Sequence, residues 1–223
     1  MGGILSPAKL RELLGDIDIY LLDQVLKGRL SRSSRVLDAG CGGGRNVTYP
    51  LKLGCEVFAI DSSPGAIAEI RSLAARLRPE LPESNFRLGN VCALPFPAGR
   101  FDVIISNAVL HFAADENEFR TMLVEMWRVL AHGGVFFARL ASTIGIEGLV
   151  VPIGGRRWRI PDGSERFLVD EQMLHDYTDE LGGTLLEPIK TVNVQNERCM
   201  TTWCMTKNDR NAPVVGQQMI KEP

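Results

Sequence analysis

The stretch that most constrains the fold of this chain is VLDAGCGGGRN, residues 36–46, an apolar run followed by an aspartate and several glycines. Gly40, Gly42 and Gly44 lack a Cβ atom and reach backbone angles that other residues avoid, so a ligand can lie directly against the main chain there. In an open α/β sheet, the loop between the first strand and the next helix offers free backbone N–H groups to a ligand. The stretch therefore predicts a strand, a ligand-binding loop and a helix.

The remaining sequence alternates short apolar runs with helical patterns, the rhythm of βαβ units and a mainly parallel sheet. Strands are predicted at residues 35–40, 55–60, 85–90, 101–108 and 135–140. Two further β-rich runs, 184–195 and 198–207, have no helix between them and predict an antiparallel hairpin at one sheet edge.

Four helices are predicted between and after these strands. The first covers residues 44–54, and Pro50 within it should cause a kink. The second begins with Ser63 as N-cap and Pro64 at its first position. The third opens with Asp115 and Glu118 at capping-box spacing and ends at Gly133, and the fourth covers residues 170–181.

Composition narrows the classes of partner. The formal net charge of −2 gives no basic field to attract nucleic acid. No apolar run is long enough to span a membrane, and the first ten residues lack the pattern of a secretion signal, so we expect a cytoplasmic protein without a membrane partner. The five cysteines form no C-x-x-C pair and have no histidine at ligand spacing, so we expect no metal site.

Asp61 is the second informative residue. It closes the second predicted strand, 21 residues after Gly40, where a carboxylate can accept hydrogen bonds from both hydroxyls of a ribose. A dinucleotide and an adenosyl compound both satisfy this pair of features. The dinucleotide fingerprint G-x-G-x-x-G/A needs a small last residue, but Arg45 or Val47 stands there, so its spacing does not fit.

The pattern that does fit is D-x-G-x-G-x-G, from Asp38 to Gly44. With VFAIDSS, GNVCALPFPAGRFDVIISNAVLHF and MWRVLAHGGVFFARL following in order, the chain resembles the class I S-adenosylmethionine-dependent methyltransferases from about Arg35 to Lys207. It is most similar to the ubiquinone/menaquinone and tellurite-resistance types, which act on small molecules. The resemblance implies a Rossmann-like, doubly wound sheet of seven mainly parallel strands, the last antiparallel, with helices on both faces. It also implies S-adenosylmethionine as cofactor, S-adenosylhomocysteine as product, and in-line methyl transfer to a small-molecule acceptor.

The same resemblance implies the cofactor-binding residues. Asp38 and Gly40 should face the methionine part, and Gly42 should let the cofactor pass close, with Cys41 and Gly44 in the same binding loop. Asp61 should bind the ribose, with Ser62 beside the adenine. The adenine edge should meet Asn90, where the family commonly has Asp, and the backbone N–H of Val91. The backbone of Ser106 and Asn107 should receive the ammonium group.

The resemblance also suggests a division of one domain over residues 1–207. An N-terminal helical segment (1–34) precedes the cofactor-binding core (35–140), an irregular insertion or lid (141–169), and the last helix with its hairpin (170–207). Residues 208–223 should form a flexible tail.

Candidates for acceptor chemistry are fewer. His111 lies just beyond the fourth predicted strand and could act as a general base, although a structural role is the alternative. Arg156, Trp158 and Arg159 could bind an acidic or aromatic substrate, or belong to a solvated loop. A nicotinamide-dependent oxidoreductase and a non-catalytic adenosyl-binding module are the competing functions.

Overall fold

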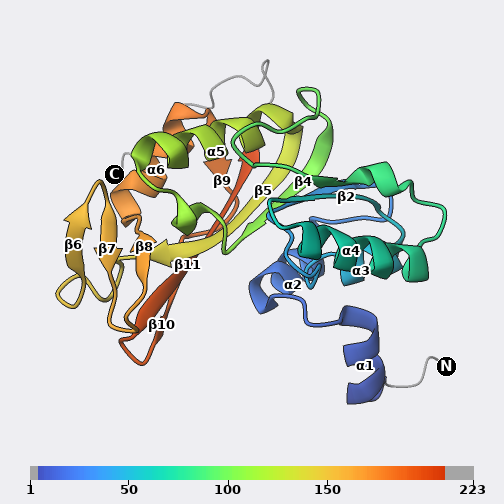
Figure 1. The fold of residues 1–223 in the computed structure, drawn as a ribbon, viewed down its shortest axis with the longest axis horizontal. Helices are drawn as coiled ribbons and strands as arrows, with labels where there is room; N and C mark the ends of the chain where they lie inside the picture. The colour runs from blue at the N-terminus through green and yellow to red at the C-terminus, as the bar shows by residue number, and fades with distance from the viewer. Residues whose placement is uncertain (1–4, 209–223) are drawn as a thin grey trace, which may run out of the picture.

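A computed structural model describes residues 5–208 of the chain (Figure 1). Its central sheet has the strand order β10-β11-β5-β4-β1-β2-β3, and a short strand, β9, also pairs with β11. The strands are β1 Arg35–Ala39, β2 Glu56–Asp61, β3 Phe86–Leu88, β4 Phe101–Asn107, β5 Leu130–Ser142, β9 Gly183–Leu185, β10 Lys190–Val194 and β11 Arg198–Lys207. Strands β1 to β5 are parallel, whereas β11 is antiparallel to β5 and to β10. The predicted sheet and its edge hairpin are confirmed.

Helices cover both faces of this sheet. One face carries α2 Ile19–Leu26, α3 Thr48–Leu53 and α4 Pro64–Leu77, and the other carries α5 Glu116–Val129 and α6 Glu171–Glu180. Alternation along β1 shows why: Val36 packs in one core with Ile70 of α4, and Leu37 packs in the other with Leu123 of α5. The helix α1 (Pro7–Leu14) buries no residue and lies apart from the sheet, beside α3 (Figure 1).

The predicted starts of two helices are confirmed. The Ser63 hydroxyl accepts a hydrogen bond from the Ala66 N–H at 3.3 Å, and α4 begins at Pro64. Asp115 accepts a hydrogen bond from the Glu118 N–H at 2.8 Å. The predicted end of α5 at Gly133 is wrong, because Leu130 is already extended and paired with Phe101 of β4.

The helix after the glycines also differs from the prediction. It begins at Thr48 rather than at Gly44, because Gly44 has a φ of 81°, in the left-handed region that a helix start cannot use. Pro50 is therefore the third residue of α3, within the first turn, where backbone N–H groups have no helical partner. The predicted kink is wrong because no helical hydrogen bond is lost.

Residues 141–169 were predicted to be irregular, and this is also wrong. They contain three antiparallel strands, β6 Val151–Gly154, β7 Arg157–Arg159 and β8 Glu165–Phe167, which we call the small sheet. A separate apolar cluster that includes Ile146, Ile160 and Leu168 packs against Cys199 of β11. The small sheet lies near the β10–β11 hairpin at one end of the molecule (Figure 1). A lid function for this segment stays a prediction.

Within residues 5–208, no helix is both long and apolar enough to cross a membrane. The predicted flexible tail, 208–223, lies outside the described residues except for Asn208.

Candidate functional site

The loop after β1 is shaped by its glycines. The N–H groups of Gly40 and Cys41 both donate to the carbonyl of Ile60, at 2.8 and 3.2 Å, which ties the loop to β2. Gly40 has a φ of 85°, and a Cβ atom there would overlap the Val109 side chain. Gly42 has a φ of 49°, and nothing lies within 4 Å of the place a Cβ would take. Gly40 therefore serves packing, whereas Gly42 leaves bare main chain facing open space.

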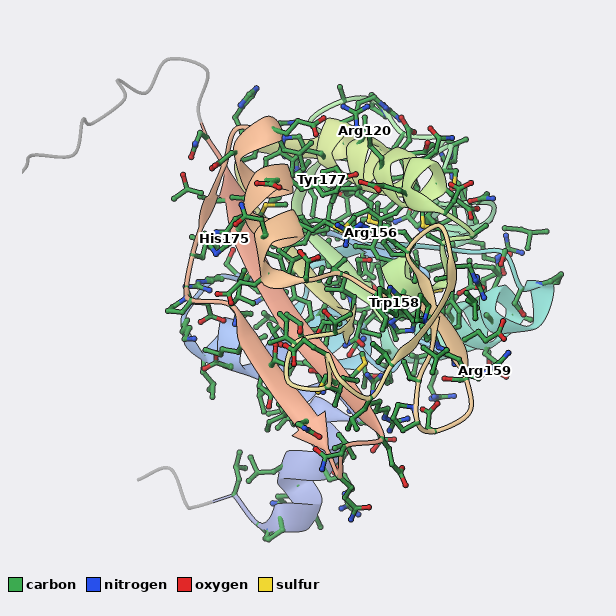
Figure 2. The ribbon with its side chains drawn as sticks, turned by 90° about the vertical axis from the view of Figure 1, so that its left-hand side faces the viewer. Arg120, Arg156, Trp158, Arg159, His175 and Tyr177 are labelled. Carbon is green, nitrogen blue, oxygen red and sulfur yellow. The ribbon has the colours of Figure 1, made fainter. Side chains whose placement is uncertain are left out.

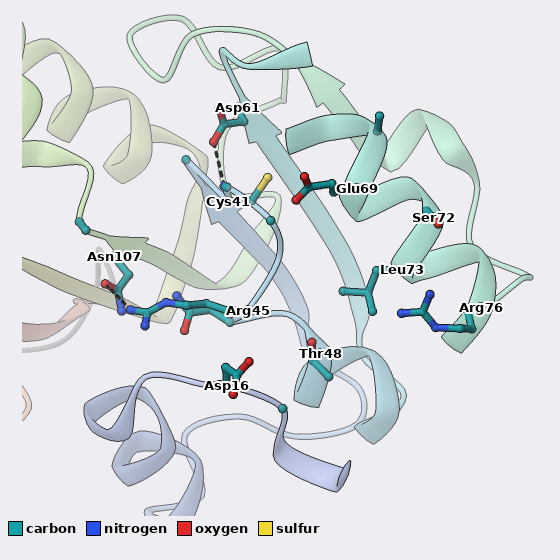
Figure 3. A pocket seen from close by; sticks show the side chains of 17 residues that line it. Asp16, Cys41, Arg45, Thr48, Asp61, Glu69, Ser72, Leu73, Arg76 and Asn107 are labelled. Atoms are coloured by element: carbon teal, nitrogen blue, oxygen red, sulfur yellow. Dashed lines mark hydrogen bonds between the residues drawn. The ribbon is translucent and has the colours of Figure 1, made fainter. Parts of the chain in front are cut away.

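Two cavities meet at this loop and form what we call the glycine-loop cleft. The large lobe, of about 930 Å³, lies between the loop, the N-terminal segment near Asp16, and α4 (Figure 3). The small lobe, of about 390 Å³, lies on the other side of Gly40. Gly40, Asp61 and Ala108 line both lobes, so these three residues mark the junction.

Asp61 lies at that junction. Its Oδ2 atom accepts a hydrogen bond from the Gly42 N–H at 2.9 Å (Figure 3), and its Oδ1 atom accepts one from the Ser63 N–H at 2.9 Å. An ionised carboxylate has about four acceptor positions, so two remain for a ligand. The loop thus orients Asp61 without using its full capacity.

Most of the predicted cofactor residues line the cleft. The large lobe contains Gly40, Cys41, Gly42, Asp61 and Asn107, and the small lobe contains Gly40, Asp61, Ser62, Asn90 and Val91. Part of Asn90 is engaged, because its Oδ1 atom accepts a hydrogen bond from the Cys92 N–H at 2.8 Å. Asp38, Gly44 and Ser106 do not line either lobe. Gly44 instead packs against Leu73 and Ile70 of α4.

Three buried polar atoms at the carboxyl ends of β1 and β4 have no hydrogen-bond partner within residues 5–208. They are Asp38 Oδ2, Ser106 Oγ and Asn107 Nδ2. Such atoms are nearly always paired in native proteins, so a group of them beside a cavity indicates a missing polar ligand. The pKa of Asp38 is raised to about 7, chiefly by burial of the side chain and secondly by the negative charge of Asp61. The positive charge of Arg45 opposes this rise.

A cluster that the sequence analysis missed connects the N-terminal segment to the cleft. Asp18, the N-cap of α2, is 5% exposed, and its Oδ2 atom accepts hydrogen bonds from Arg139 at 3.0 Å and Arg45 at 3.3 Å. Arg45 also donates to Asn107 Oδ1 at 3.3 Å (Figure 3). The aspartate before an apolar run was a visible N-cap signal, but its arginine partners are far away in sequence.

His111 lies in a short 3-10 turn, Leu110–Phe112, and lines a third cavity of about 320 Å³. Its Nδ1 atom accepts a hydrogen bond from the Ala141 N–H at 3.1 Å. Burial, and then the charge of Arg166, lowers the pKa of His111 to about 4, so the ring is neutral near pH 7. A neutral ring that accepts at Nδ1 carries its proton on Nε2. The remaining ring nitrogen is thus a donor, which opposes a role as base.

Arg156, Trp158 and Arg159 lie elsewhere. Arg156 donates to Asp170 at 2.9 Å, on the side of Arg120 and Tyr177 (Figure 2). Trp158 packs against the apolar cluster that includes Ile160 and Leu168. Arg159 lies farther along the small sheet (Figure 2) and donates to Glu165 at 2.9 Å. In the part of the chain that the structure describes, none of the three lines the cleft or the His111 cavity. Their contact with substrate stays a prediction.

Comparison with known proteins shows what this region is similar to. Residues 37–138, which span β1 to β5 with the glycine loop and Asp61, match the family model described as "Methyltransferase domain". The segment that carries the glycine loop and Asp61 is therefore similar to methyltransferase domains.

Curated relatives of this chain include a malonyl-[acyl-carrier protein] O-methyltransferase of Salmonella typhimurium. The two are 35% identical over 154 residues, which cover 68% of this chain and 55% of that protein. An uncharacterized methyltransferase of Synechocystis is 30% identical over 107 residues, covering 48% of this chain and 47% of that one. The chain spans about half the length of the curated relatives it matches.

Solved structures share the fold of this chain. An S-adenosylmethionine-dependent methyltransferase of Methanosarcina mazei superposes with a TM-score of 0.66 at 19% identity, over 82% of this chain and 97% of that one. The 1,6-didemethyltoxoflavin-N1-methyltransferase of Burkholderia thailandensis was solved with S-adenosylhomocysteine. It superposes with a TM-score of 0.65 at 19% identity, over 94% of this chain and 93% of that one.

Proposed function

We propose that the chain binds S-adenosylmethionine in the glycine-loop cleft and transfers its methyl group to a small-molecule acceptor, with S-adenosylhomocysteine as product. The observation that carries this proposal is the junction of the two lobes. Asp61 lies there with two acceptor positions free, so a ribose at the junction would place an adenine in one lobe and an amino-acid part in the other.

The residues of the cleft fit this cofactor. Ser62, Asn90 and Val91 would surround the adenine, and Gly42 would let the ligand lie against main chain. The amino-acid part would lie in the large lobe with Cys41 and Asn107. The unpaired atoms of Asp38 and Ser106, at the carboxyl ends of β1 and β4, would offer the acceptors that an ammonium group needs.

The bound cofactor supplies an already activated methyl group on a sulfonium, so the chain must chiefly hold an acceptor in line with it. Ala108, at the junction, has a φ of 61°, an unusual angle for a residue other than glycine. It lines the cleft and the His111 cavity as well, so the acceptor would approach past Ala108. His111 would donate a hydrogen bond to the acceptor, which suits an acceptor that needs no deprotonation.

The identity of the acceptor is a finer part of the proposal. The resemblance to ubiquinone/menaquinone and tellurite-resistance types favours a free small molecule. The relatives named as malonyl-[acyl-carrier protein] O-methyltransferases support a second candidate, an oxygen acceptor presented on an acyl carrier.

A methyl-transfer assay tests the proposal. The chain would be incubated with S-adenosylmethionine and a panel that includes a malonyl thioester and a quinol, with product detected by mass spectrometry. S-adenosylhomocysteine formed together with a methylated acceptor supports transfer. Tight cofactor binding without transfer to any acceptor would instead favour an adenosyl-binding module, and binding of NADH alone would favour an oxidoreductase.

A further inference from the structure

The third cavity, which His111 lines, shares part of its wall with the glycine-loop cleft. Arg45, Asn107 and Ala108 line both the large lobe and this cavity of about 320 Å³. The rest of its wall comes from β5, the small sheet and the β10–β11 hairpin. A group bound here would therefore lie next to the place where a methyl group is delivered.

Four arginines from four parts of the chain line this cavity, which we call the arginine cavity. They are Arg45 of the glycine loop, Arg139 of β5, Arg166 of β8 and Arg198 of β11. Bringing several like charges around one small space is unfavourable unless opposite charges are also present. The balance of charge is therefore the informative quantity.

Protein carboxylates compensate only part of this charge. Asp162 is the one carboxylate on the wall within the described residues, and it accepts hydrogen bonds from the N–H and the hydroxyl of Ser164, at 2.9 and 2.6 Å. Asp18, behind the wall, pairs with both Arg45 and Arg139. Two carboxylates thus face four guanidinium groups, and the cavity keeps a positive charge.

The other two arginines have little engagement with the protein. Arg166 donates to the backbone carbonyl of Glu165 at 2.9 Å and lies over the Phe112 ring, 5.0 Å from its centre. The Arg198 guanidinium makes no hydrogen bond or ion pair with residues 5–208, although its charge reaches Asp162. Both side chains are free to donate to a ligand.

Two buried neutral donors complete the wall. Asn107 is 8% exposed and its Nδ2 atom has no partner within residues 5–208. His111 is 5% exposed and, with Nδ1 engaged by Ala141, has its Nε2–H available. A buried donor without an acceptor, such as Asn107 Nδ2, is costly, so the wall lacks an acceptor that a ligand would supply.

We infer that the arginine cavity binds an anionic group, a carboxylate or a phosphate, of the methyl acceptor. This inference rests on the proposed function, because it assigns the cavity to the acceptor of that reaction. Guanidinium groups match both anions through paired, charge-assisted hydrogen bonds, and the amide and imidazole donors add two uncharged contacts. An uncharged acceptor would leave the arginines uncompensated.

The test measures binding of small anions to the chain saturated with S-adenosylhomocysteine, by calorimetry. Malonate and inorganic phosphate are the two probes, and malonamide is an uncharged probe of similar size. We expect malonate or phosphate to bind and malonamide not to bind, and the stronger of the two anions identifies the group. Arg166→Gln and Arg198→Gln should each raise the Kd of that anion about tenfold or more, because each removes a charge-assisted contact.

Arg120→Gln is the matched control, since Arg120 lies on α5, pairs with Glu180 on the surface, and does not line the arginine cavity. It should leave anion binding unchanged. A separate titration of S-adenosylhomocysteine without anions reports on the cleft, so failure of the proposed function is distinguished from failure of this inference. Binding of neither anion to the saturated wild type, equal binding of malonamide, or anion affinity unchanged in both cavity variants would overturn the inference.

Discussion

Asp38 should make the free energy of unfolding of the chain depend on pH. Its side chain is 1% exposed, its Oδ2 atom has no partner within residues 5–208, and Asp61 adds a second negative charge nearby. Burial first, and then Asp61, raises the pKa of Asp38 from 3.8 to about 7. Asp38→Asn keeps the shape of the side chain and removes its ability to ionise.

The sign of the effect follows from proton binding in the two states. Between about pH 4 and about pH 7, Asp38 keeps its proton when folded and loses it when unfolded, so the free energy of unfolding falls as pH rises. At roughly 1.4 kcal/mol per pH unit, a window of about three units gives about 4 kcal/mol. Below this window both states are protonated, and above it both are ionised, so the contribution levels off. Asn escapes this loss, although its buried amide adds a cost that does not vary with pH.

The assay is urea unfolding of wild type and Asp38→Asn from about pH 4 to about pH 8. The variant should gain stability relative to wild type by about 4 kcal/mol across that range. Asp102→Asn is the control, because hydrogen bonds from Arg35 lower the pKa of Asp102 below 3.8, so its stabilising contribution is present throughout this range and is lost only below about pH 4. This variant should therefore be destabilised by a nearly constant amount from about pH 4 to about pH 8. A difference between wild type and Asp38→Asn that is constant with pH would refute the reasoning.

Three further predictions concern the loop, the N-terminal segment and a helix cap. Gly40→Ala adds a methyl group against Val109 at a φ of 85° and should lower the free energy of unfolding, measured in urea, by about 2 kcal/mol. Gly42→Ala meets no neighbour and should lower it by only about 1 kcal/mol. Equal losses in the two variants would contradict the packing argument. Gly42→Ala should nevertheless weaken S-adenosylhomocysteine binding in calorimetry, since its methyl group enters the cleft. Asp18→Asn leaves Arg45 and Arg139 without their shared carboxylate and should lower the free energy of unfolding by about 3 kcal/mol in the same assay. A loss below about 1 kcal/mol would show that the cluster is not needed for stability. Ser63→Ala removes the cap of α4 and should cost about 1 kcal/mol, with faster amide exchange at Ala66, whereas unchanged exchange there would contradict the capping role.

The sequence predicted those features whose cause is local. The apolar run of β1, the N-caps Ser63 and Asp115, and the glycines before Asp61 each depend on a few neighbouring residues. The cleft follows from them, because the carboxyl ends of parallel strands meet at one edge of the sheet.

Features that depend on distant residues were not predictable in the same way. The Asp18 cluster joins residues that are 27 and 121 positions apart, and no local pattern links them. The small sheet consists of strands as short as three residues that are stabilised by pairing with one another, so its sequence resembles a loop. The end of α5 was set by the pairing of Leu130 with Phe101 rather than by the glycine at 133.

The most direct test of the central claim is calorimetric titration of S-adenosylmethionine, S-adenosylhomocysteine and NADH into wild type, Asp61→Asn and Glu56→Gln. Glu56 begins the strand that Asp61 ends, and pairs with Arg100 away from the cleft, so its variant removes a carboxylate of the same strand without touching the site. We expect both adenosyl ligands to bind wild type and Glu56→Gln with the same Kd, Asp61→Asn to raise that Kd about tenfold, and NADH not to bind. Absence of adenosyl binding to wild type, or equal binding to Asp61→Asn, would contradict the claim.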